Sequence, residues 1–232
     1  MTPLTDITIY FNKNWIENTL DARDFQLKLN YLMDFYHRNL DGYKPPKTSR
    51  ISIELVDTKD KENQFYFGSI LRIYAYFNLG EFLKINDENK LKYLLDLLHK
   101  LLIESAIKNN WEINIFKNSY DLILRSKFNF IKRFDLKESR DKKKKGQAII
   151  TKTTTESKLT IQLSSETNSK FINLITKANT YWFDSIYKIA SNCKWIDNDK
   201  FGYKPKHSLI YSYYSISDNN VISNMDNLYE NI

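Results

Sequence analysis

Several residue types that build catalytic or cofactor sites are scarce in this chain of 232 residues. Its single cysteine, Cys193, excludes an internal disulfide and a cysteine-based zinc site. The five glycines stand singly, so glycine-rich loops that hold phosphates or dinucleotides are missing. The three histidines form no spaced pair of the kind that zinc proteases use. We therefore expect no cofactor and no metal, and we favour a protein that is not an enzyme.

Long apolar runs are also missing. The richest stretch, residues 91–107, is interrupted by lysine, aspartate, histidine and glutamate, which excludes a membrane-spanning helix there. Polar residues are spread through the first 15 residues of the sequence. A secretory signal would instead have a basic start followed by an uninterrupted apolar stretch. These features, with the single cysteine, predict a cytoplasmic protein without a membrane partner.

Catalytic patterns are correspondingly weak. A serine nucleophile on a Gly-x-Ser-x-Gly turn is absent from the sequence. The nearest pattern to a metal-dependent nuclease is formed by Glu54, Asp57 and Lys59, where carboxylates and a lysine lie close together. A solvated turn explains Asp57 and Lys59 equally well, so this pattern does not establish an enzyme.

The basic charge is concentrated in one segment. The chain has a net charge of +7, and residues 126–160 contain eleven basic and four acidic residues, a difference of +7. The densest part, 137–145, is predicted to be a hairpin loop. It is either a solvated loop or a site that contacts nucleic acid or an acidic protein. Its candidate binding residues are Arg140, Lys142, Lys143, Lys144 and Lys145.

Hydrophobic spacing predicts alternating helices and strands. Strands are expected at 5–11, 49–57, 64–78, 128–134, 147–155, 158–164 and 207–214, and helices near 21–40, 87–109, 111–124 and 166–193. Strands 49–57 and 64–78 should form a hairpin, and the three strands within 128–164 a meander. The expected fold class is α+β, a mostly antiparallel sheet with three to four amphipathic helices packed on it. We expect one domain over 1–232, with an alternative seam near 124–126 and a polar tail at 217–232.

Two predicted strands are rich in tyrosine. The even positions of strand 64–78 and the last strand supply Tyr66, Arg72, Tyr74, Tyr76, Tyr211 and Tyr213. Tyrosine and arginine are common at the centres of protein interfaces, so these residues are candidates for binding another protein. Helices that cover the same strand face would instead make them part of the core.

These observations favour a non-catalytic protein-binding module. By elimination, we interpret it as a bacterial inhibitor or immunity-type protein that occludes a toxin with its tyrosine-rich surface. The excess of lysine favours an acidic toxin or an acidic cleft as the partner. The alternative is a nucleic-acid-binding protein that uses loop 137–145 with the aromatic strand faces.

Overall fold

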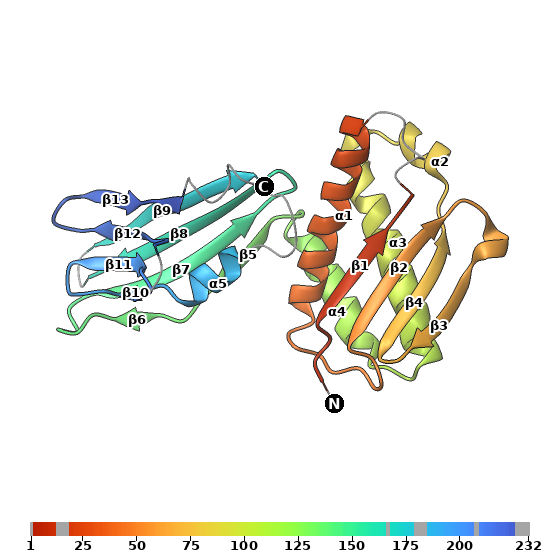
Figure 1. Cartoon of the computed structure of the whole chain (residues 1–232), viewed down its shortest axis with the longest axis horizontal. Coiled ribbons are helices and arrows are strands. Elements are labelled where there is room, and N and C mark those ends of the chain that lie inside the picture. Colours follow the sequence, from red (N-terminus) through yellow and green to blue (C-terminus); the bar gives the residue numbers. More distant parts are fainter. Residues whose placement is uncertain (1, 13–18, 166–167, 179–184, 207–208, 226–232) are drawn as a thin grey trace. The chain divides into compact units, whose positions relative to one another are not determined.

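The computed structural model divides into two compact units, Met1–Phe128 and Asn129–Ile232, which are described separately (Figure 1). The structure describes residues 2–12, 19–165, 168–178, 185–206 and 209–225. Five α-helices and thirteen strands form within these ranges, which confirms the expected α+β fold. The boundary between the units falls four residues or fewer from the predicted seam at 124–126. The single domain over 1–232 stays a prediction, because a division into units does not test it.

The first unit combines a four-stranded sheet with helices. Its elements are β1 (Asp6–Tyr10), α1 (Thr19–Asn39), β2 (Arg50–Val56), the short 3₁₀ turn η2 (Lys59–Lys61), β3 (Asn63–Phe67), β4 (Ile70–Tyr76), α2 (Leu79–Lys84), α3 (Asp87–Lys108) and α4 (Ile113–Arg125). The strand order is β1-β2-β4-β3. Strands β1, β2 and β4 run parallel to one another, and the edge strand β3 runs antiparallel to β4.

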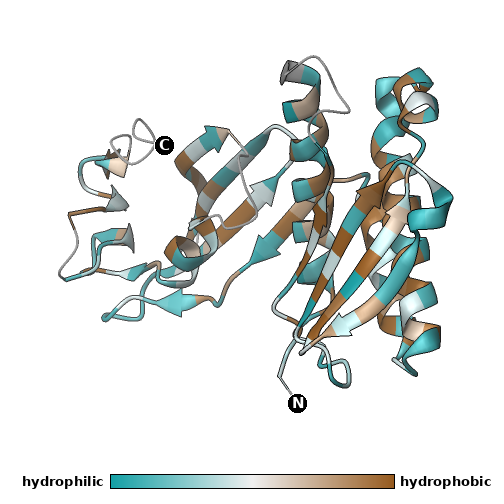
Figure 2. Ribbon diagram, turned by 45° about the vertical axis from the view of Figure 1, so that its right-hand side comes forward, coloured by the Kyte–Doolittle hydropathy of each residue, from teal (hydrophilic) through white to brown (hydrophobic). Residues whose placement is uncertain are grey.

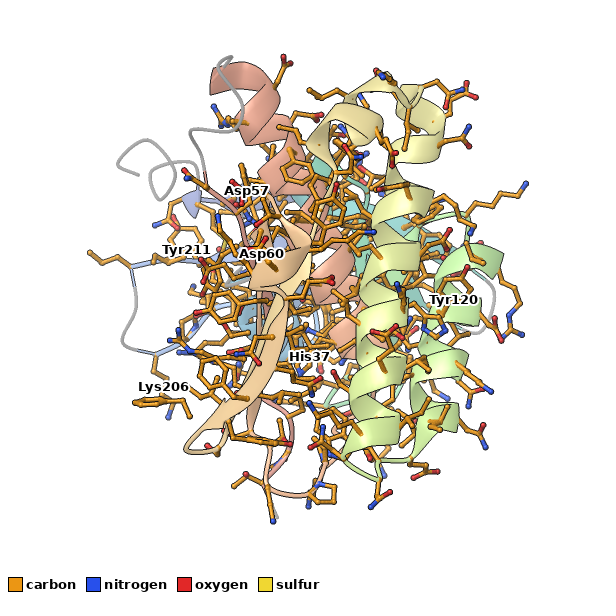
Figure 3. All side chains as sticks on the ribbon, turned by 90° about the vertical axis from the view of Figure 1, so that its right-hand side faces the viewer. His37, Asp57, Asp60, Tyr120, Lys206 and Tyr211 are labelled. Carbon is orange, nitrogen blue, oxygen red and sulfur yellow. The ribbon has the colours of Figure 1, made fainter. Side chains whose placement is uncertain are left out.

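The core of the first unit lies between one face of this sheet and helices α1, α3 and α4. Hydrophobic and hydrophilic residues alternate along β2 and β4 (Figure 2), as expected for strands with one buried face. The predicted leucine stripe of α3 is confirmed, since Leu94, Leu98 and Leu102 are each less than 2% exposed. Figure 3 shows α3 and α4 together on one side of the sheet.

The predicted hairpin between 49–57 and 64–78 is wrong. Residues 64–78 do not form one strand, because the chain turns sharply at Gly68, which has a φ of +60°, and at Ser69. The hairpin therefore joins β3 to β4. Strand β4 returns beside β2 in a parallel pairing, with Ile53 opposite Ile73. A single glycine within an alternating run can mark a turn. The prediction followed the alternation on both sides of Gly68 and therefore gave one strand where the structure has two.

The second unit consists mainly of two antiparallel sheets. One has the order β5-β7-β8-β9, with β6 paired to β7, and the other has the order β10-β11-β12-β13. The bounds are β5 (Phe130–Arg133), β6 (Lys137–Glu138), β7 (Lys145–Lys152), β8 (Glu156–Ser164), β9 (Ser169–Ala178), α5 (Ile186–Ser191), β10 (Lys194–Trp195), β11 (Lys200–Tyr203), β12 (Ser212–Ser215) and β13 (Asn220–Ser223). The predicted meander within 128–164 is confirmed as β5, β7 and β8.

The two sheets of the second unit share a core. The ring of Phe201, which is 1% exposed, lies directly against the backbone of Gly146 on β7. The Ser212 hydroxyl on β12 donates to the carbonyl oxygen of Leu174 on β9 at 3.1 Å. Strand β12 thus joins the two sheets, and the small residues Gly146 and Ser212 permit their close approach.

The predicted long helix at 166–193 is wrong for the residues that the structure describes. They form strand β9 and the six-residue helix α5, while residues 166–167 and 179–184 lie outside the described ranges. A β-bulge causes the misleading pattern: Leu159 pairs with Ile175 and Thr160 with Asn173, which leaves Leu174 as an extra residue. Two adjacent apolar residues, Leu174 and Ile175, are consequently both buried, so strict alternation is lost.

The end of the chain also departs from expectation. The predicted last strand at 207–214 is displaced to β12, and residues 207–208 lie outside the described ranges. The polar segment that starts at Ser217 contains strand β13, which pairs with β12. Among the helices of the described ranges, none combines the length and apolar character that crossing a membrane requires.

Candidate functional site

The candidate site lies on the sheet face of the first unit that is opposite to its helices, which we call the open face. In the register of the sheet, Tyr10, Glu54, Tyr74 and Asn63 form one row across β1, β2, β4 and β3. The next row runs Thr8, Ser52, Arg72 and Phe65, and the third runs Asp6, Arg50, Ile70 and Phe67. No α-helix from the described part of this unit lies on that face (Figures 1 and 3).

The open face includes Arg72, Tyr74 and Tyr76 of the predicted tyrosine-rich surface but not Tyr66. Residues opposite each other in an antiparallel pair share a face, so Tyr66 lies with its partner Leu71 on the helix side. Its hydroxyl donates to Asn109 at the end of α3 at 3.0 Å and contacts the Thr48 hydroxyl at 3.0 Å. The turn at Gly68 reverses the predicted alternation and places Phe65 and Phe67 on the open face instead.

Aromatic side chains are exposed along this face. Phe67 is 69% exposed, Tyr10 54% and Phe65 41%. The rings of Phe65 and Tyr74 stack with their centroids 6.0 Å apart and an interplanar angle of 13°. The Lys59 ammonium lies 5.6 Å from the centroid of the Tyr76 ring, so the turn after β2 adjoins the end of this face. The face therefore presents exposed aromatic rings beside polar side chains.

An open pocket of about 530 Å³ lies where β2 ends. Its lining consists of Asn12, Glu54, Leu55, Val56, Asp57, Lys61, Asn63, Phe65 and Tyr74. A smaller pocket of about 280 Å³ adjoins it through Asp57 and is lined by Tyr76 and the residues that follow. Both lie at the carboxyl ends of parallel strands, where ligands commonly bind in sheets of this kind.

The charged groups of the larger pocket are unequally partnered. The Lys61 ammonium donates to Asp57 Oδ1 at 2.7 Å, and this hydrogen bond lowers the pKa of Asp57. The Asp60 carboxyl also has a lowered pKa, through its hydrogen bond with the Thr58 side chain. Figure 3 shows Asp57 and Asp60 on the turn that follows β2. In the described ranges, the carboxylate of Glu54 has no hydrogen-bond or ion-pair partner.

The pattern of Glu54, Asp57 and Lys59 does not come together as a nuclease centre. Lys59 contacts the ring of Tyr76, and Asp57 pairs with Lys61. Among the described residues, no group of three or more histidine, cysteine, aspartate or glutamate side chains is placed to hold a metal ion. The turn around Asp57 instead holds the exposed ion pair between Asp57 and Lys61, and such a pair contributes little to stability.

The predicted basic loop is an ordered turn between β6 and β7 in the second unit. Ser139 is buried at its base, where its hydroxyl donates to Asp141 at 2.6 Å and accepts from the Lys144 backbone at 3.0 Å. The hydrogen bond from Ser139 lowers the pKa of Asp141. The Lys144 ammonium donates to the carbonyl oxygen of Asn198 at 2.7 Å. The loop is therefore fixed by its own side chains and by the turn before β11.

The five candidate cations of this loop differ in their availability. Lys144 is half-buried on Asn198, and Lys145 lies 3.7 Å from Glu138. The side chains of Arg140, Lys142 and Lys143 are exposed and form no ion pair or side-chain hydrogen bond within the described residues. Of the three, Lys143 lies close enough to Asp141 for its charge to contribute to the lowered pKa of that carboxyl. These three side chains are the part of the loop that is available to a partner.

The remaining predicted tyrosines also belong to the second unit. Tyr213 is 8% exposed, and its ring centroid lies 5.9 Å from that of Tyr211, which is half-buried. The Lys204 ammonium lies 5.2 Å from the centroid of the Tyr213 ring. Tyr213 is thus largely a core residue, and the predicted site residues are divided between the two units.

The cysteine is buried in the core, and each histidine in the described ranges contacts a hydrogen-bonding group of its own unit. Burial raises the pKa of the Cys193 thiol to about 12, which keeps it protonated and unreactive. His37 contacts the carbonyl oxygen of Leu4 at 2.8 Å, and His99 contacts the Tyr36 hydroxyl at 2.7 Å. The third histidine, His207, lies outside the described ranges.

Comparisons with protein-family models, with curated proteins and with solved structures find no match for this chain. Sequence reasoning identified Arg72, Tyr74 and Tyr76 on the open face, and it missed Phe65, Phe67 and the binding role open to Glu54. The signal that would have placed Phe65 and Phe67 is Gly68, because a glycine turn reverses the order of the two faces.

Proposed function

We propose that this protein is a non-catalytic protein-binding module, of the inhibitor or immunity type, that acts in the cytoplasm by occluding a partner protein. The open face is the binding surface. The observation that supports this proposal is the exposure of Tyr10, Phe65 and Phe67 on a sheet face opposite to the helices of the unit. Clustered aromatic side chains on a rigid scaffold are the usual anchors of protein interfaces.

Restricted side-chain freedom favours binding at the open face, in addition to its exposed apolar area. Phe65 and Tyr74 stack on each other across paired strands, so little side-chain freedom is lost when a partner covers them. Tyr74 also retains a polar hydroxyl, which suits an interface that is exposed to water before binding. Occlusion of a partner requires only this surface, and no reacting group.

The loop at 139–144 has a separate part in this proposal. Arg140, Lys142 and Lys143 would attract an acidic partner or an acidic cleft and raise the association rate at low salt. Glutamine substitution of these three residues should slow association and weaken its salt dependence, while dissociation stays nearly unchanged. Stopped-flow association at two salt concentrations measures this, and an unchanged rate would remove the loop from the mechanism.

The test of the main proposal is a double variant of the open face. Tagged wild-type protein and the variant F65A/Y74A are used to capture partners from native cells, and the affinity of the purified complex is then measured. We expect the double variant to weaken the complex at least about thirtyfold, since two anchor residues are lost. The control is F171A, which removes a phenylalanine that is 59% exposed on β9. Equal affinities of wild type and F65A/Y74A would refute the proposal.

Nucleic-acid binding is the second candidate function. It is favoured by the exposed cations Arg140, Lys142 and Lys143, which lie within four consecutive residues of the described loop and form no ion pair there. Titration into labelled single- and double-stranded nucleic acid at two salt concentrations tests it. Binding that weakens steeply with salt and is lost when the three residues become glutamine would place this function first. No binding at low salt would eliminate it.

A further inference from the structure

We propose that the pocket beside Glu54 is a receptor for an arginine side chain of the partner protein. This inference rests on the proposed protein-binding function and specifies the chemistry that the open face recognises. Its basis is a carboxylate that has no partner among the described residues and lies between aromatic residues at the edge of a pocket. The arginine supplies the charge and the planar shape that this arrangement lacks.

The sheet register places Glu54 between two tyrosines. Tyr10 on β1 and Tyr74 on β4 are its direct neighbours in the same row. Adjacent strands are about 4.8 Å apart, so the three side chains stand next to each other on the open face. Glu54 and Tyr74 line the pocket of about 530 Å³, and Phe65, stacked on Tyr74, lines it as well.

The charges around this pocket leave one carboxylate available. Asp57 is paired with Lys61 at 2.7 Å, so these two lining residues neutralise each other. Glu54 is exposed and has no ion-pair or hydrogen-bond partner in the described part of the chain. Arg72 lies one row away on the same face, and it forms no ion pair with Glu54 within the described structure. The pocket therefore attracts a cation, and Arg72 opposes it.

A guanidinium fits this arrangement better than a compact ammonium does. It forms two parallel hydrogen bonds with a carboxylate, and its flat faces stack on aromatic rings such as Tyr74 and Phe65. Cations over aromatic rings are attracted most strongly where the site is partly desolvated, as in a pocket. Because exposed rings continue from the pocket along the open face to Phe67, the arginine is expected to belong to a protein that also covers those rings.

The test uses N-acetyl-argininamide as the probe and its citrulline analogue as an uncharged control of the same shape. Each is titrated into the full chain, and two-dimensional NMR follows the backbone amides. We expect saturable shifts at residues that line the pocket, with the citrulline analogue at least about tenfold weaker because the charge-assisted hydrogen bonds are lost. Binding that does not saturate, or equal affinity for both probes, would overturn the inference.

Three variants localise the binding. E54Q should weaken the arginine probe at least about tenfold, whereas the matched control E81Q, an exposed glutamate on α2, should leave its affinity unchanged. R72Q removes the nearby cation and should strengthen binding about twofold. An equal effect of E54Q and E81Q on the affinity of the arginine probe would overturn the inference, because the probe would then not bind through Glu54.

The failure of this inference is distinguishable from that of the proposed function. The arginine titration needs no partner protein, and the partner measurement with F65A/Y74A needs no arginine probe. If the probe does not bind but F65A/Y74A loses the partner, only the arginine receptor is wrong. If F65A/Y74A retains full affinity for the partner, the proposed interface is wrong whatever the probe does.

Discussion

Gly146 is a residue whose size determines how closely two elements pack. A Cβ atom at this position would lie 2.5 Å from a ring carbon of Phe201, closer than two carbon atoms pack. Phe201 is 1% exposed, so its ring is enclosed by other atoms of the core, which must shift if the ring moves. The contact between β7 and β11 in the second unit therefore depends on the absence of a side chain at Gly146.

We expect G146A to lower the free energy of unfolding by about 1–3 kcal/mol, the usual cost of overpacking a core. Chemical denaturation of wild type and variant measures this. The matched control is G80A in α2, where the added Cβ meets Asn78 Oδ1 at an ordinary 3.5 Å. Alanine favours a helix over glycine, so G80A should be neutral or stabilising by up to about 1 kcal/mol. A G146A variant as stable as wild type would contradict this account of the contact.

The candidate site also depends on single positions. Alternation correctly identified Arg72 and Tyr74 as neighbours on one face, because both lie after the turn in β4. It misplaced Tyr66 and Phe65, which lie before the turn in β3. The turn at Gly68, a residue of positive φ, decides which side chains of β3 share a face with those of β4. The spacing of the hydrophobic residues does not reveal this turn.

At the scale of elements, helices α1, α3 and α4 meet around a polar cluster. The Tyr36 hydroxyl donates to the carbonyl oxygen of Phe116 at 2.8 Å, so His99 Nδ1 is the donor in its 2.7 Å contact with the same hydroxyl. The His99 ring stacks on Tyr120 with centroids 4.2 Å apart. Tyr120 in turn donates to Asp96 at 2.7 Å, and Figure 3 shows it in the helix layer. Burial raises the pKa of the Tyr36 hydroxyl, which therefore stays protonated.

This cluster predicts a pH dependence of stability. Burial lowers the pKa of His99 below its usual value, while the nearby Asp121 and Asp96 oppose this shift and Lys117 adds to it. The unfolded chain therefore binds a proton more readily than the folded chain, and the stability from neutral His99 is lost as the pH falls from about 6.5 through the lower folded pKa.

The measurement compares the unfolding free energy of wild type and H99Q across this pH range. The remaining titratable groups are the same in both proteins, so the difference between the two curves of unfolding free energy against pH isolates the contribution of His99. We expect wild type to lose more stability than H99Q as the pH falls. Parallel curves would contradict the assigned direction of the His99 shift.

At the scale of the whole molecule, the basic charge belongs to one unit. Residues 129–232 contain 17 basic and 11 acidic residues, a net charge of +6, whereas residues 1–128 contain 18 and 17, a net charge of +1. The proposed arginine receptor is in the nearly neutral unit, and the basic loop is in the other. In the proposed binding mode, the two units would therefore bind different chemical groups.

Hydrogen exchange of G146A tests whether the two units form one domain. Each unit has its own buried residues, so we expect the variant to lose amide protection in residues 129–232 and to keep it in residues 1–128. Loss of protection throughout the chain would instead support the single domain predicted from the sequence. Wild type and G80A provide the reference profiles.

The sequence by itself determined the α+β class, the helix over 87–109, the meander within 128–164 and the turn position of the basic loop. These features follow from the local spacing of hydrophobic residues and from turn residues, because both depend on interactions between residues that are close in the sequence. Tertiary structure alone decided that β4 lies parallel beside β2, that a bulge at Leu174 makes 169–178 a strand, and that Glu54 lies between Tyr10 and Tyr74. Each of these depends on pairing between segments distant in the chain, and such pairing leaves no periodic signal within either segment.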